Sequence, residues 1–343
     1  MSESYILVTG GTGYIGSHVA SVLLAAGEKV LIVDNLLNSK ENVATRLCEL
    51  SKQSVPFLRG DLTQKSFVEE IFTQYKISTV MHFAAMKAVG ESSRIPLEYY
   101  HNNLNSLLNL LQEMRVRDIR TFIFSSSATV YGDPIKLPIT EQHPVGNCTN
   151  PYGRTKYYSE QILTDLYASE PDKWKICLLR YFNPVGAHPT KLLGEDPTGV
   201  PSNLLPATIY ALAGKIPEIK IFGDDYPTPD GTGVRDYIHI MDLSEGHLSA
   251  LKYCNANTGL HVFNLGTGNG YSVLDVINMV EKVSGKQVPK LVTSRRDGDI
   301  ATCYADASLA KDKMGWEAKR GLEEMCRDAY EYSEYCSNTK TKI

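Results

Sequence analysis

The most constraining feature of the sequence is a glycine-rich turn near its start. An apolar run ends at Thr9 and is followed at once by Gly-Gly-Thr-Gly-Tyr-Ile-Gly at residues 10–16, where a helical periodicity begins. In such a turn Gly10 permits a tight bend, Gly13 lets the backbone approach a pyrophosphate, and Gly16 lets the helix pack closely on the strand. The free N–H groups and the helix dipole then favour phosphate. Because strand, turn and helix occur in this order, the segment predicts a dinucleotide-binding unit.

The first half of the chain alternates short apolar runs with helix-period segments. The runs are nearly continuous in apolar character, as expected for strands buried on both faces of a sheet. The expected strands are Tyr5–Thr9, Val30–Asp34, Val55–Arg59, Thr79–Phe83, Thr121–Ser126 and Ile176–Tyr181. The expected helices between them are Ile15–Ala26, Thr63–Tyr75, Pro96–Met114 and Tyr152–Tyr167. This alternation predicts an α/β fold with a Rossmann-type, doubly wound parallel sheet.

The pattern loosens after Asn183, where proline and glycine become frequent and helix-period segments return only at intervals. We expect residues 1–182 to form a dinucleotide-binding Rossmann domain. Residues 183–343 are expected to form a smaller α/β lobe that covers the carboxyl ends of the sheet and binds the substrate. Segments near residues 230–265 are candidates to return to the first domain.

Composition narrows the class of protein. The formal net charge is −4 and there is no block of basic residues, so neither nucleic acid nor an acidic membrane surface is expected as a partner. The seven cysteines include no Cys-x-x-Cys pair and no Cys/His metal spacing, which favours reduced thiols in a cytoplasmic protein without a metal site. We expect no signal peptide, and no apolar stretch approaches the roughly 20 residues that a membrane span needs.

A carboxylate stands at the end of the second expected strand. At this place Asp34 would accept hydrogen bonds from the 2′-hydroxyl of an adenosine ribose and repel a 2′-phosphate. Asn35 and Leu36 follow, and no arginine is at hand to receive a phosphate. This pattern favours NAD over NADP. The alternative is that Asp34 only caps a loop.

A helix start after residue 149 carries the candidate catalytic pair. Asn150 suits the N-cap and Pro151 the first helical position. Tyr152 and Lys156 are four residues apart and therefore share one helix face. A phenol, with an ordinary pKa near 10, is too weak a base at neutral pH. A neighbouring ammonium and an oxidised nicotinamide would together lower that pKa by about 3 units, which requires about 4 kcal/mol.

Three serines end the fifth expected strand, at the carboxyl edge where ligands of such sheets bind. We expect the hydroxyl of Ser127 to hydrogen-bond the reacting oxygen and to share its proton with Tyr152. The alternative is that Tyr152 and Lys156 are ordinary surface residues of an amphipathic helix, as most Tyr-x-x-x-Lys pairs are. Their place after a glycine turn and a serine-rich strand end favours catalysis.

These motifs resemble the extended short-chain dehydrogenase/reductase superfamily, through the glycine turn, the Ser127…Tyr152-x-x-x-Lys156 arrangement and the length of the chain. Longer stretches narrow the resemblance to the UDP-galactose (UDP-glucose) 4-epimerase family: Asp34–Leu36, Phe83–Lys87, Ser125–Gly132, Arg180–His188 and Gly231–Asp242. The resemblance implies that NAD stays bound through turnover. It also implies that Tyr152 takes the proton of the sugar 4-hydroxyl while C4 gives a hydride to NAD, and that the hydride returns to the opposite face of a 4-keto sugar.

The same resemblance implies which residues contact NAD. Those implied around the pyrophosphate and adenosine are Gly10, Gly13, Tyr14, Ile15, Gly16, Asp34, Asn35, Leu36, Asn38, Ser39, Asp61 and Leu62. Those implied toward the nicotinamide are Phe83, Ala84, Ala85, Lys87, Asn102, Ser125, Tyr152, Lys156, Tyr181 and Phe182.

A second implied set contacts the UDP-sugar. Its members are Lys87, Ser127, Tyr152, Phe182, Asn183, Asn203, Leu204, Lys220, Ile221, Phe222, Arg235, Tyr237, Arg296, Asp299 and Cys303. Arg235 suits the diphosphate because a guanidinium matches phosphate with a fork of donors. The alternative for Arg235 is a surface ion pair with Asp236. The aromatic and apolar members, taken one by one without the resemblance, are better explained as packing residues.

Cys303 bears on the range of sugars. In the resembling enzymes this position faces the sugar; it is large in forms limited to hexoses and small in forms that also accept N-acetylhexosamines. Cysteine is much smaller than tyrosine, so the resemblance implies that UDP-GalNAc and UDP-GlcNAc are substrates as well as UDP-Gal and UDP-Glc. The alternative is a buried structural thiol.

Three other functions share parts of the pattern. A nucleotide-sugar 4,6-dehydratase needs acidic residues beside the serine, where this chain has Ala128 and Thr129. A redox-sensing NAD-binding protein would be expected to lack one member of the tyrosine–lysine pair. A net dehydrogenase would release NADH. The resemblance further implies a homodimer paired through Pro96–Met114 and Tyr152–Tyr167.

Overall fold

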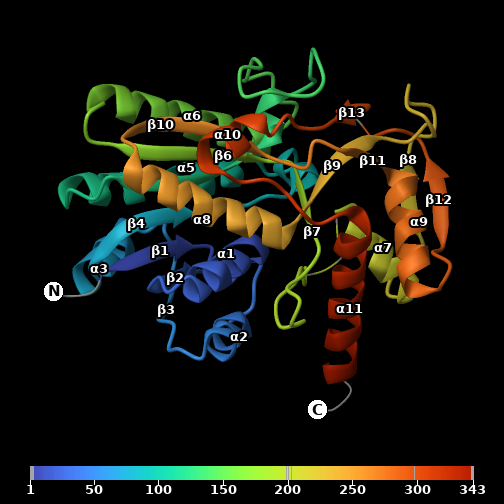
Figure 1. The fold of residues 1–343 in the computed structure, drawn as a ribbon, viewed down its shortest axis with the longest axis horizontal. Helices are drawn as coiled ribbons and strands as arrows, with labels where there is room; N and C mark the ends of the chain where they lie inside the picture. Colours follow the sequence, from blue (N-terminus) through green and yellow to red (C-terminus); the bar gives the residue numbers. More distant parts are fainter. Residues whose placement is uncertain (1–3, 198, 200, 202, 297, 341–343) are drawn as a thin grey trace.

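The computed structural model describes residues 4–197, 199, 201, 203–296 and 298–340. Its largest element is a seven-stranded parallel sheet in the order β10-β6-β5-β4-β1-β2-β3 (Figure 1). The strands are β1 (Tyr5–Thr9), β2 (Val30–Asp34), β3 (Phe57–Arg59), β4 (Ile77–His82), β5 (Thr121–Ser127), β6 (Lys175–Tyr181) and β10 (Gly259–Leu265). The strand order reverses between β1 and β4, which puts a ligand crevice at the carboxyl ends of these two strands.

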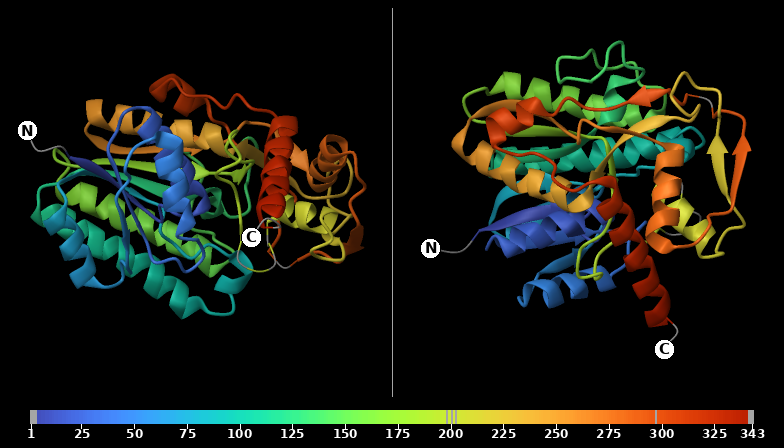
Figure 2. Two further views of the ribbon diagram at one scale, coloured as in Figure 1. Left: turned by 90° about the horizontal axis from the view of Figure 1, so that it is seen from below. Right: turned by 45° about the vertical axis from the view of Figure 1, so that its right-hand side comes forward.

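Helices cover both faces of this sheet (Figure 2, left view). Side chains alternate along β1, so that Ile6 and Val8 enter one core with α1 and α8 while Leu7 enters the other with α3 and α5. This two-sided burial explains the continuous apolar runs. The helices of the first face are α1 (Tyr14–Ala25), α2 (Asn42–Ser51), α8 (Ile240–Ala256) and α10 (Ser308–Met314). Those of the second are α3 (Lys65–Gln74), α5 (Pro96–Val116) and α6 (Pro151–Ser169).

Two short helices follow strands of the large sheet at its carboxyl end. They are α4 (Val89–Ser92), after β4, and the 3-10 helix η1 (Ala128–Tyr131), after β5.

A smaller group of elements stands beside the large sheet (Figure 1). It contains the strand order β11-β9-β13, with β7 also paired to β9, and the parallel pair β12-β8. Leu205, Ile277 and Met325 lie in its own apolar core. The strands are β7 (Asn183–Val185), β8 (Ile219–Phe222), β9 (Val234–His239), β11 (Gly270–Ser272), β12 (Lys290–Thr293) and β13 (Thr302–Cys303). The helices are α7 (Leu204–Leu212), α9 (Val273–Ser284) and α11 (Leu322–Lys340).

The predicted fold class is confirmed, and the predicted strands of the large sheet lie within about two residues of the observed ones. The sequence interpretation missed α2 and β10. The run of β10 is interrupted by His261, and its middle residues are only half-buried because it is the edge strand. Both β10 and α8 return to the large sheet from the second half of the chain. The division at residues 182 and 183 stays a prediction.

Within the described ranges, no helix is long and apolar enough to cross a membrane. All seven cysteines are free. Among those same residues, no group of three His, Cys, Asp or Glu side chains is arranged to hold a metal ion.

Candidate active site

The glycine turn joins β1 to α1 with very little space around it. Gly10 has φ +66°, and a Cβ there would lie 2.8 Å from the backbone nitrogen of Ala84. A Cβ on Gly16 would lie 2.2 Å from the carbonyl oxygen of Gly10. The N-cap of α1 is Gly13, which provides no side-chain cap, so the first N–H groups of the helix keep their capacity for a ligand. The turn is therefore a cradle that other residue types would fill.

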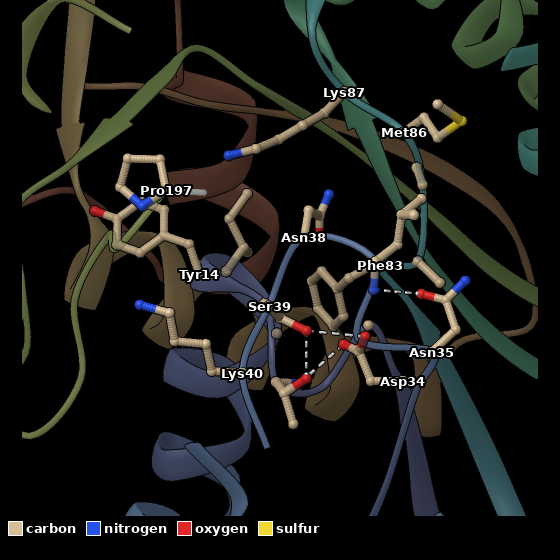
Figure 3. Close-up of a pocket in the computed structure, with 18 of the residues that line it drawn as sticks. Tyr14, Asp34, Asn35, Asn38, Ser39, Lys40, Phe83, Met86, Lys87 and Pro197 are labelled. Atoms are coloured by element: carbon tan, nitrogen blue, oxygen red, sulfur yellow. Dashed lines mark hydrogen bonds between the residues drawn. The ribbon is translucent and has the colours of Figure 1, made fainter. Parts of the chain in front are cut away.

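Asp34 lies at the carboxyl end of β2 and faces this cradle (Figure 3). Its carboxylate accepts hydrogen bonds from the backbone N–H of Thr12 at 3.2 Å, from the N–H of Leu36 at 2.9 Å and from the hydroxyl of Ser39 at 3.0 Å. Asp34 thus organises the loop that follows β2, as the loop-capping alternative supposed. Each carboxylate oxygen can still accept from a ligand, so the contact of Asp34 with a ribose hydroxyl stays a prediction.

A cavity of about 790 Å³ opens at the reversal of strand order. Most of the predicted cofactor residues line it: Gly10, Gly13, Tyr14, Ile15, Gly16, Asp34, Asn35, Asn38, Ser39, Asp61, Leu62, Phe83, Ala84, Ala85, Lys87, Asn102 and Ser125. Asn203, predicted to contact substrate, also lines it. The predicted cofactor residues outside the lining are Leu36, Tyr152, Lys156, Tyr181 and Phe182.

Sequence reasoning missed the residues that close one side of this cavity. Glu195 accepts hydrogen bonds from Lys87 Nζ at 3.3 Å and from Asn203 Nδ2 at 3.0 Å, and Lys40 forms an ion pair with Asp196. Figure 3 shows Lys87 reaching toward the segment that contains Pro197. No local pattern in the sequence marks Glu195 or Asp196, since their lysine partners, Lys87 and Lys40, are far away along the chain.

The candidate catalytic pair, Tyr152 and Lys156, lies on α6, where the sequence predicts a helix. The side chain of Asn150 accepts a hydrogen bond from the N–H of Gly153 at 2.9 Å, and Pro151 occupies the first turn. This cap begins α6 next to the end of β5. Tyr152 and Lys156 then both face β5, where they meet the serine-rich strand end.

The Ser127 side chain lies near enough to Tyr152 to favour the ionised form of its phenol. Burial raises the pKa of Tyr152 to about 12, and Ser127 opposes that rise. The Ser127 oxygen also accepts hydrogen bonds from the N–H and the hydroxyl of Thr129 at 3.3 and 3.0 Å. Burial therefore outweighs the lowering of the phenol pKa that was expected from the neighbouring Lys156.

Lys156 is buried beneath this pair. Its ammonium donates a hydrogen bond to the backbone carbonyl of Ser125 and lies 4.8 Å from the centroid of the Phe124 ring. Burial lowers the pKa of Lys156 to about 7, against an opposing effect of Glu160. Lys156 is therefore poised between its charged and neutral forms near neutral pH, and it reaches the cavity through Ser125.

Tyr181 continues the site on the far side of Ser125, with which it shares a hydrogen bond. Because His247 donates its Nδ1 proton to the Leu243 carbonyl at 2.9 Å, its Nε2 accepts from the Tyr181 hydroxyl at 2.5 Å. The His247 ring also packs against Phe83, with the centroids 5.0 Å apart. His247 is thus a further residue behind the site that the sequence did not point to.

The predicted substrate residues fall into separate groups. Arg235 is half-buried on β9 and donates to the carbonyl oxygen of Val234 at 2.8 Å. Its alternative partner, Asp236, is fully buried and accepts from the N–H groups of Gly268 and Ala305 instead. Because successive side chains of a strand point to opposite faces, these sequence neighbours do not meet. The ion-pair alternative for Arg235 is wrong.

A second group lies on β8 and the segment before β13. The Arg296 guanidinium stacks 4.6 Å from the Phe222 ring centroid and donates to Asp299 at 2.9 Å. Of the two residues before Phe222, Ile221 is buried in the core of the smaller lobe and Lys220 is exposed on the opposite face of β8.

A third group surrounds Cys303. It is the register partner of Arg235 and packs in one cluster with Phe182 and Val130. Val130 belongs to η1, directly after Ser127, so the cluster links Cys303 to the catalytic strand end. Asn183 and Tyr237 are register partners on β7 and β9, and Leu204 begins α7.

This fold and this constellation define an extended short-chain dehydrogenase/reductase. The family model described as GDP-mannose 4,6 dehydratase matches residues 7–329. A UDP-glucose 4-epimerase of Drosophila melanogaster is 52% identical over 340 residues, covering 97% of both chains. The chain belongs to the UDP-glucose 4-epimerase family, and the resemblance inferred from the motifs is confirmed.

Two further comparisons agree. A UDP-glucose 4-epimerase of Bacillus subtilis (strain 168) is 52% identical over 327 residues, covering 95% of this chain and 96% of the relative. The crystal structure of UDP-glucose 4-epimerase from Bifidobacterium longum in complex with NAD+ and UDP superposes with a TM-score of 0.95 at 47% identity, covering 98% of this chain and 99% of the other.

Proposed function

We propose that this protein interconverts UDP-galactose and UDP-glucose by epimerisation at C4 through a transient 4-keto sugar, with tightly bound NAD. The arrangement of Tyr152 and Lys156 on one face of α6, against Ser127 and Ser125 at the end of β5 and beside the glycine cradle, carries the proposal. Family membership over nearly the whole chain supports it. The galactose pathway would be its setting, and free cysteines suit the cytoplasm.

The residues of the cavity fit NAD. Glycine at positions 10 and 16 lets the turn pack against Ala84 and against the start of α1, which leaves the uncapped N–H groups at the start of α1 available to a pyrophosphate, and Asp34 presents a carboxylate for a ribose 2′-hydroxyl. NAD, when bound, accepts a hydride from the sugar and returns it. The residues predicted for the nicotinamide end, from Phe83 to Phe182, are proposed to line that part of the site.

The chain's own groups would handle the proton. Tyr152 would take the proton of the sugar 4-hydroxyl and give it back after the sugar turns, while Ser127 holds the same oxygen. The charged form of Lys156 would favour the phenolate, because an opposite charge nearby lowers the pKa of a phenol. Burial raises the pKa of Tyr152 and lowers that of Lys156, and a bound oxidised nicotinamide would supply a further positive charge that favours the phenolate.

The uridine diphosphate would be held firmly and the sugar loosely, so that the sugar can turn. Remote binding energy of this kind serves a reacting centre elsewhere. Arg235, free of the Asp236 pair, would bind the diphosphate. Arg296, stacked on Phe222, would bind toward the uridine. The proposed contacts are completed by Lys87, Phe182, Asn183, Asn203, Leu204, Lys220, Ile221, Tyr237, Asp299 and Cys303.

UDP-GalNAc and UDP-GlcNAc are proposed as further substrates, because Cys303 is small where it packs near the catalytic strand end. The 4,6-dehydratase alternative lacks a carboxylate where elimination would need one: η1 begins with Ala128 and Thr129, and the Thr129 hydroxyl donates to Ser127. A 4-keto-6-deoxy product would restore that alternative.

The test supplies purified protein with UDP-galactose and no added NAD. Formation of UDP-glucose supports the proposal, and stoichiometric release of NADH would indicate a net dehydrogenase. A Tyr152→Phe variant is expected to bind dinucleotide but lose conversion. Unchanged conversion in that variant, or a wild-type protein that contains no dinucleotide and gains none on soaking, would contradict the proposal.

A homodimer is proposed through α5 and α6. These helices expose Leu97 (77%), Leu108 (37%) and Tyr158 (43%), and the rings of Tyr158 and Tyr100 lie 6.2 Å apart across the two helices. Large apolar side chains exposed together favour an interface. Sedimentation should give a dimer for the wild type and a monomer for Leu97→Glu; a wild-type monomer at working concentration would contradict the proposal.

A further inference from the structure

Directly behind the reacting side chains lies a row of buried polar groups that the proposed mechanism does not use. Ser126, Arg180 and Asn264 are register partners on β5, β6 and β10. Glu160 of α6 joins Ser126 to Arg180, and Tyr131 joins Arg180 to Asn264. We call these five residues the Glu160 row.

Glu160 is the centre of this row, and its side chain is 3% exposed. Its carboxylate accepts a hydrogen bond from the Ser126 hydroxyl at 2.5 Å and two from Arg180, at 2.9 and 2.6 Å. A two-point guanidinium–carboxylate contact fixes orientation as well as distance. One side chain therefore ties α6 to two neighbouring strands.

The hydrogen bond between Glu160 and Ser126 lies next to the contacts of Lys156 and Tyr152 with β5. Ser126 lies between the residue whose carbonyl accepts from Lys156 and the residue whose hydroxyl meets Tyr152. Tyr152, Lys156 and Glu160 are spaced by four residues and so face β5 on successive turns of α6. The contact between Glu160 and Ser126 is thus one of three that set the position of the helix over the strand end.

Glu160 is also the nearest acidic influence on Lys156, one helical turn away. The other charged and titratable groups around the pair come from the packed elements. They are His82 on β4, Tyr181 and Arg180 on β6, Tyr131 on η1, Tyr99 on α5, Glu91 on α4, which is bonded to Tyr99, and Glu141 and Cys148 in the segment between η1 and α6. Removal of the Glu160 charge would leave the Arg180 guanidinium uncompensated beside them.

We propose that Glu160 is a positioning residue for the epimerase reaction. It holds the end of β5 in the position in which the Ser127 side chain faces Tyr152, and its negative charge favours the ammonium form of Lys156. Glu160 contacts none of the reacting atoms and acts through Ser126 and Lys156. The inference rests on the proposed function, whose proton transfer it refines.

Two variants separate charge from geometry. Glu160→Gln keeps the size and the acceptor oxygen but removes the charge; we expect kcat to fall by about 100-fold and the alkaline limb of its pH profile to move down by about one unit. Ser126→Ala keeps the ion pair between Glu160 and Arg180 but loses the hydrogen bond between Glu160 and β5. We expect its kcat to fall by about tenfold and the alkaline limb of its pH profile to stay at the wild-type pH. KM for the UDP-sugar should stay within about twofold in both.

The conservative variant and a matched control complete the set. Glu160→Asp retains the charge with a shorter reach, so its kcat should fall while its alkaline limb matches the wild type. Glu113→Gln removes another buried carboxylate paired to an arginine, Arg117, on α5 and should leave both quantities unchanged.

A second readout does not depend on turnover. The ultraviolet titration of Tyr152, taken as the difference from Tyr152→Phe in each background, should show a lower phenol pKa in Glu160→Gln than in the wild type, because Lys156, with a pKa of about 7, is neutral where the phenol titrates and the loss of the Glu160 charge then favours the phenolate. The same titration and pH profile in both would overturn the proposal. If Glu160→Gln fails to fold, wild-type rates in both Ser126→Ala and Glu160→Asp would also overturn it. A wild type that does not convert UDP-galactose defeats the proposed function instead, and the titration still tests the role of Glu160.

Discussion

The hydroxyl of Tyr14, in the first turn of α1, donates a hydrogen bond to the backbone carbonyl of Gly186 at 2.8 Å. This contact joins the helix that follows the glycine cradle to the segment that follows β7. The dinucleotide cavity borders both Tyr14 and the continuation of that segment at Gly194 and Glu195. The Tyr14 hydroxyl therefore joins the Lys87–Glu195 and Lys40–Asp196 pairs in connecting the first half of the chain to the segment beside the cavity.

Replacement of Tyr14 by Phe should weaken that connection. Loss of one partly buried hydrogen bond lowers the free energy of unfolding by about 1 kcal/mol, and bound dinucleotide should leave faster because the closing segment is held less firmly. Urea denaturation and the rate of NAD loss on dilution would measure both. Tyr5→Phe is the control, since the Tyr5 ring packs edge-on against Tyr75 far from the cavity. A variant with wild-type release would contradict the expectation.

Gly16 should be the least tolerant glycine of the cradle. In Gly16→Ala the new methyl group would meet the carbonyl oxygen of Gly10 at 2.2 Å, so the turn and α1 must separate. We expect dinucleotide content to fall by more than about tenfold and thermal stability to drop. Gly321→Ala is the matched control, because a Cβ there meets nothing within 4 Å. Equal dinucleotide content in the two purified variants would show that the close approach is not needed.

Acid should destabilise the fold through buried histidines. Burial lowers the pKa of His18 and of His82 to about 3 and that of His247 to about 4, while the unfolded chain titrates near 6.5. Below pH 6.5 the unfolded state therefore binds more protons, so the stability present above that pH is lost as the pH falls toward 3. Each histidine should cost about 2 kcal/mol by about pH 5.

Urea unfolding between pH 8 and 5 measures this slope. His18→Asn should reduce the dependence of the free energy of unfolding on pH by the contribution of one histidine. The Nε2 atom of His18 is buried and, within the part of the chain that the structure describes, has no hydrogen-bond partner. The exposed His101, changed to Asn, serves as the control. Parallel slopes for His18→Asn and the wild type would contradict the assignment.

Local rules account for what could be predicted. Tyr152 and Lys156 share a helix face by their spacing, and Ser127 reaches them because strand ends of a parallel sheet meet at one edge. What the sequence could not show are contacts across long separations. Glu195 meets Lys87 from a segment without periodicity, and β10 joins the large sheet through pairing that no local pattern encodes.

The ion-pair alternative for Arg235 was wrong for a simpler reason. The alternative of an ion pair between Arg235 and Asp236 considered only that these residues are adjacent in sequence. On a strand, adjacency puts side chains on opposite faces, and Asp236 instead binds backbone N–H groups inside the smaller lobe.

Cys303 provides the sharpest test of substrate range. Its side chain packs with Phe182 and Val130 beside the catalytic strand end, and burial raises the pKa of its thiol to about 11, so it is neutral near pH 7 and acts through its size. Cys303→Tyr should reduce conversion of UDP-GalNAc by at least about tenfold and leave UDP-galactose conversion within about threefold. Overpacking costs about 1–3 kcal/mol, so thermal unfolding must show a folded variant. Cys303→Ala, which keeps the space, should retain both activities. Equal loss of both in a folded Cys303→Tyr protein would mean that Cys303 packs the site without selecting the sugar.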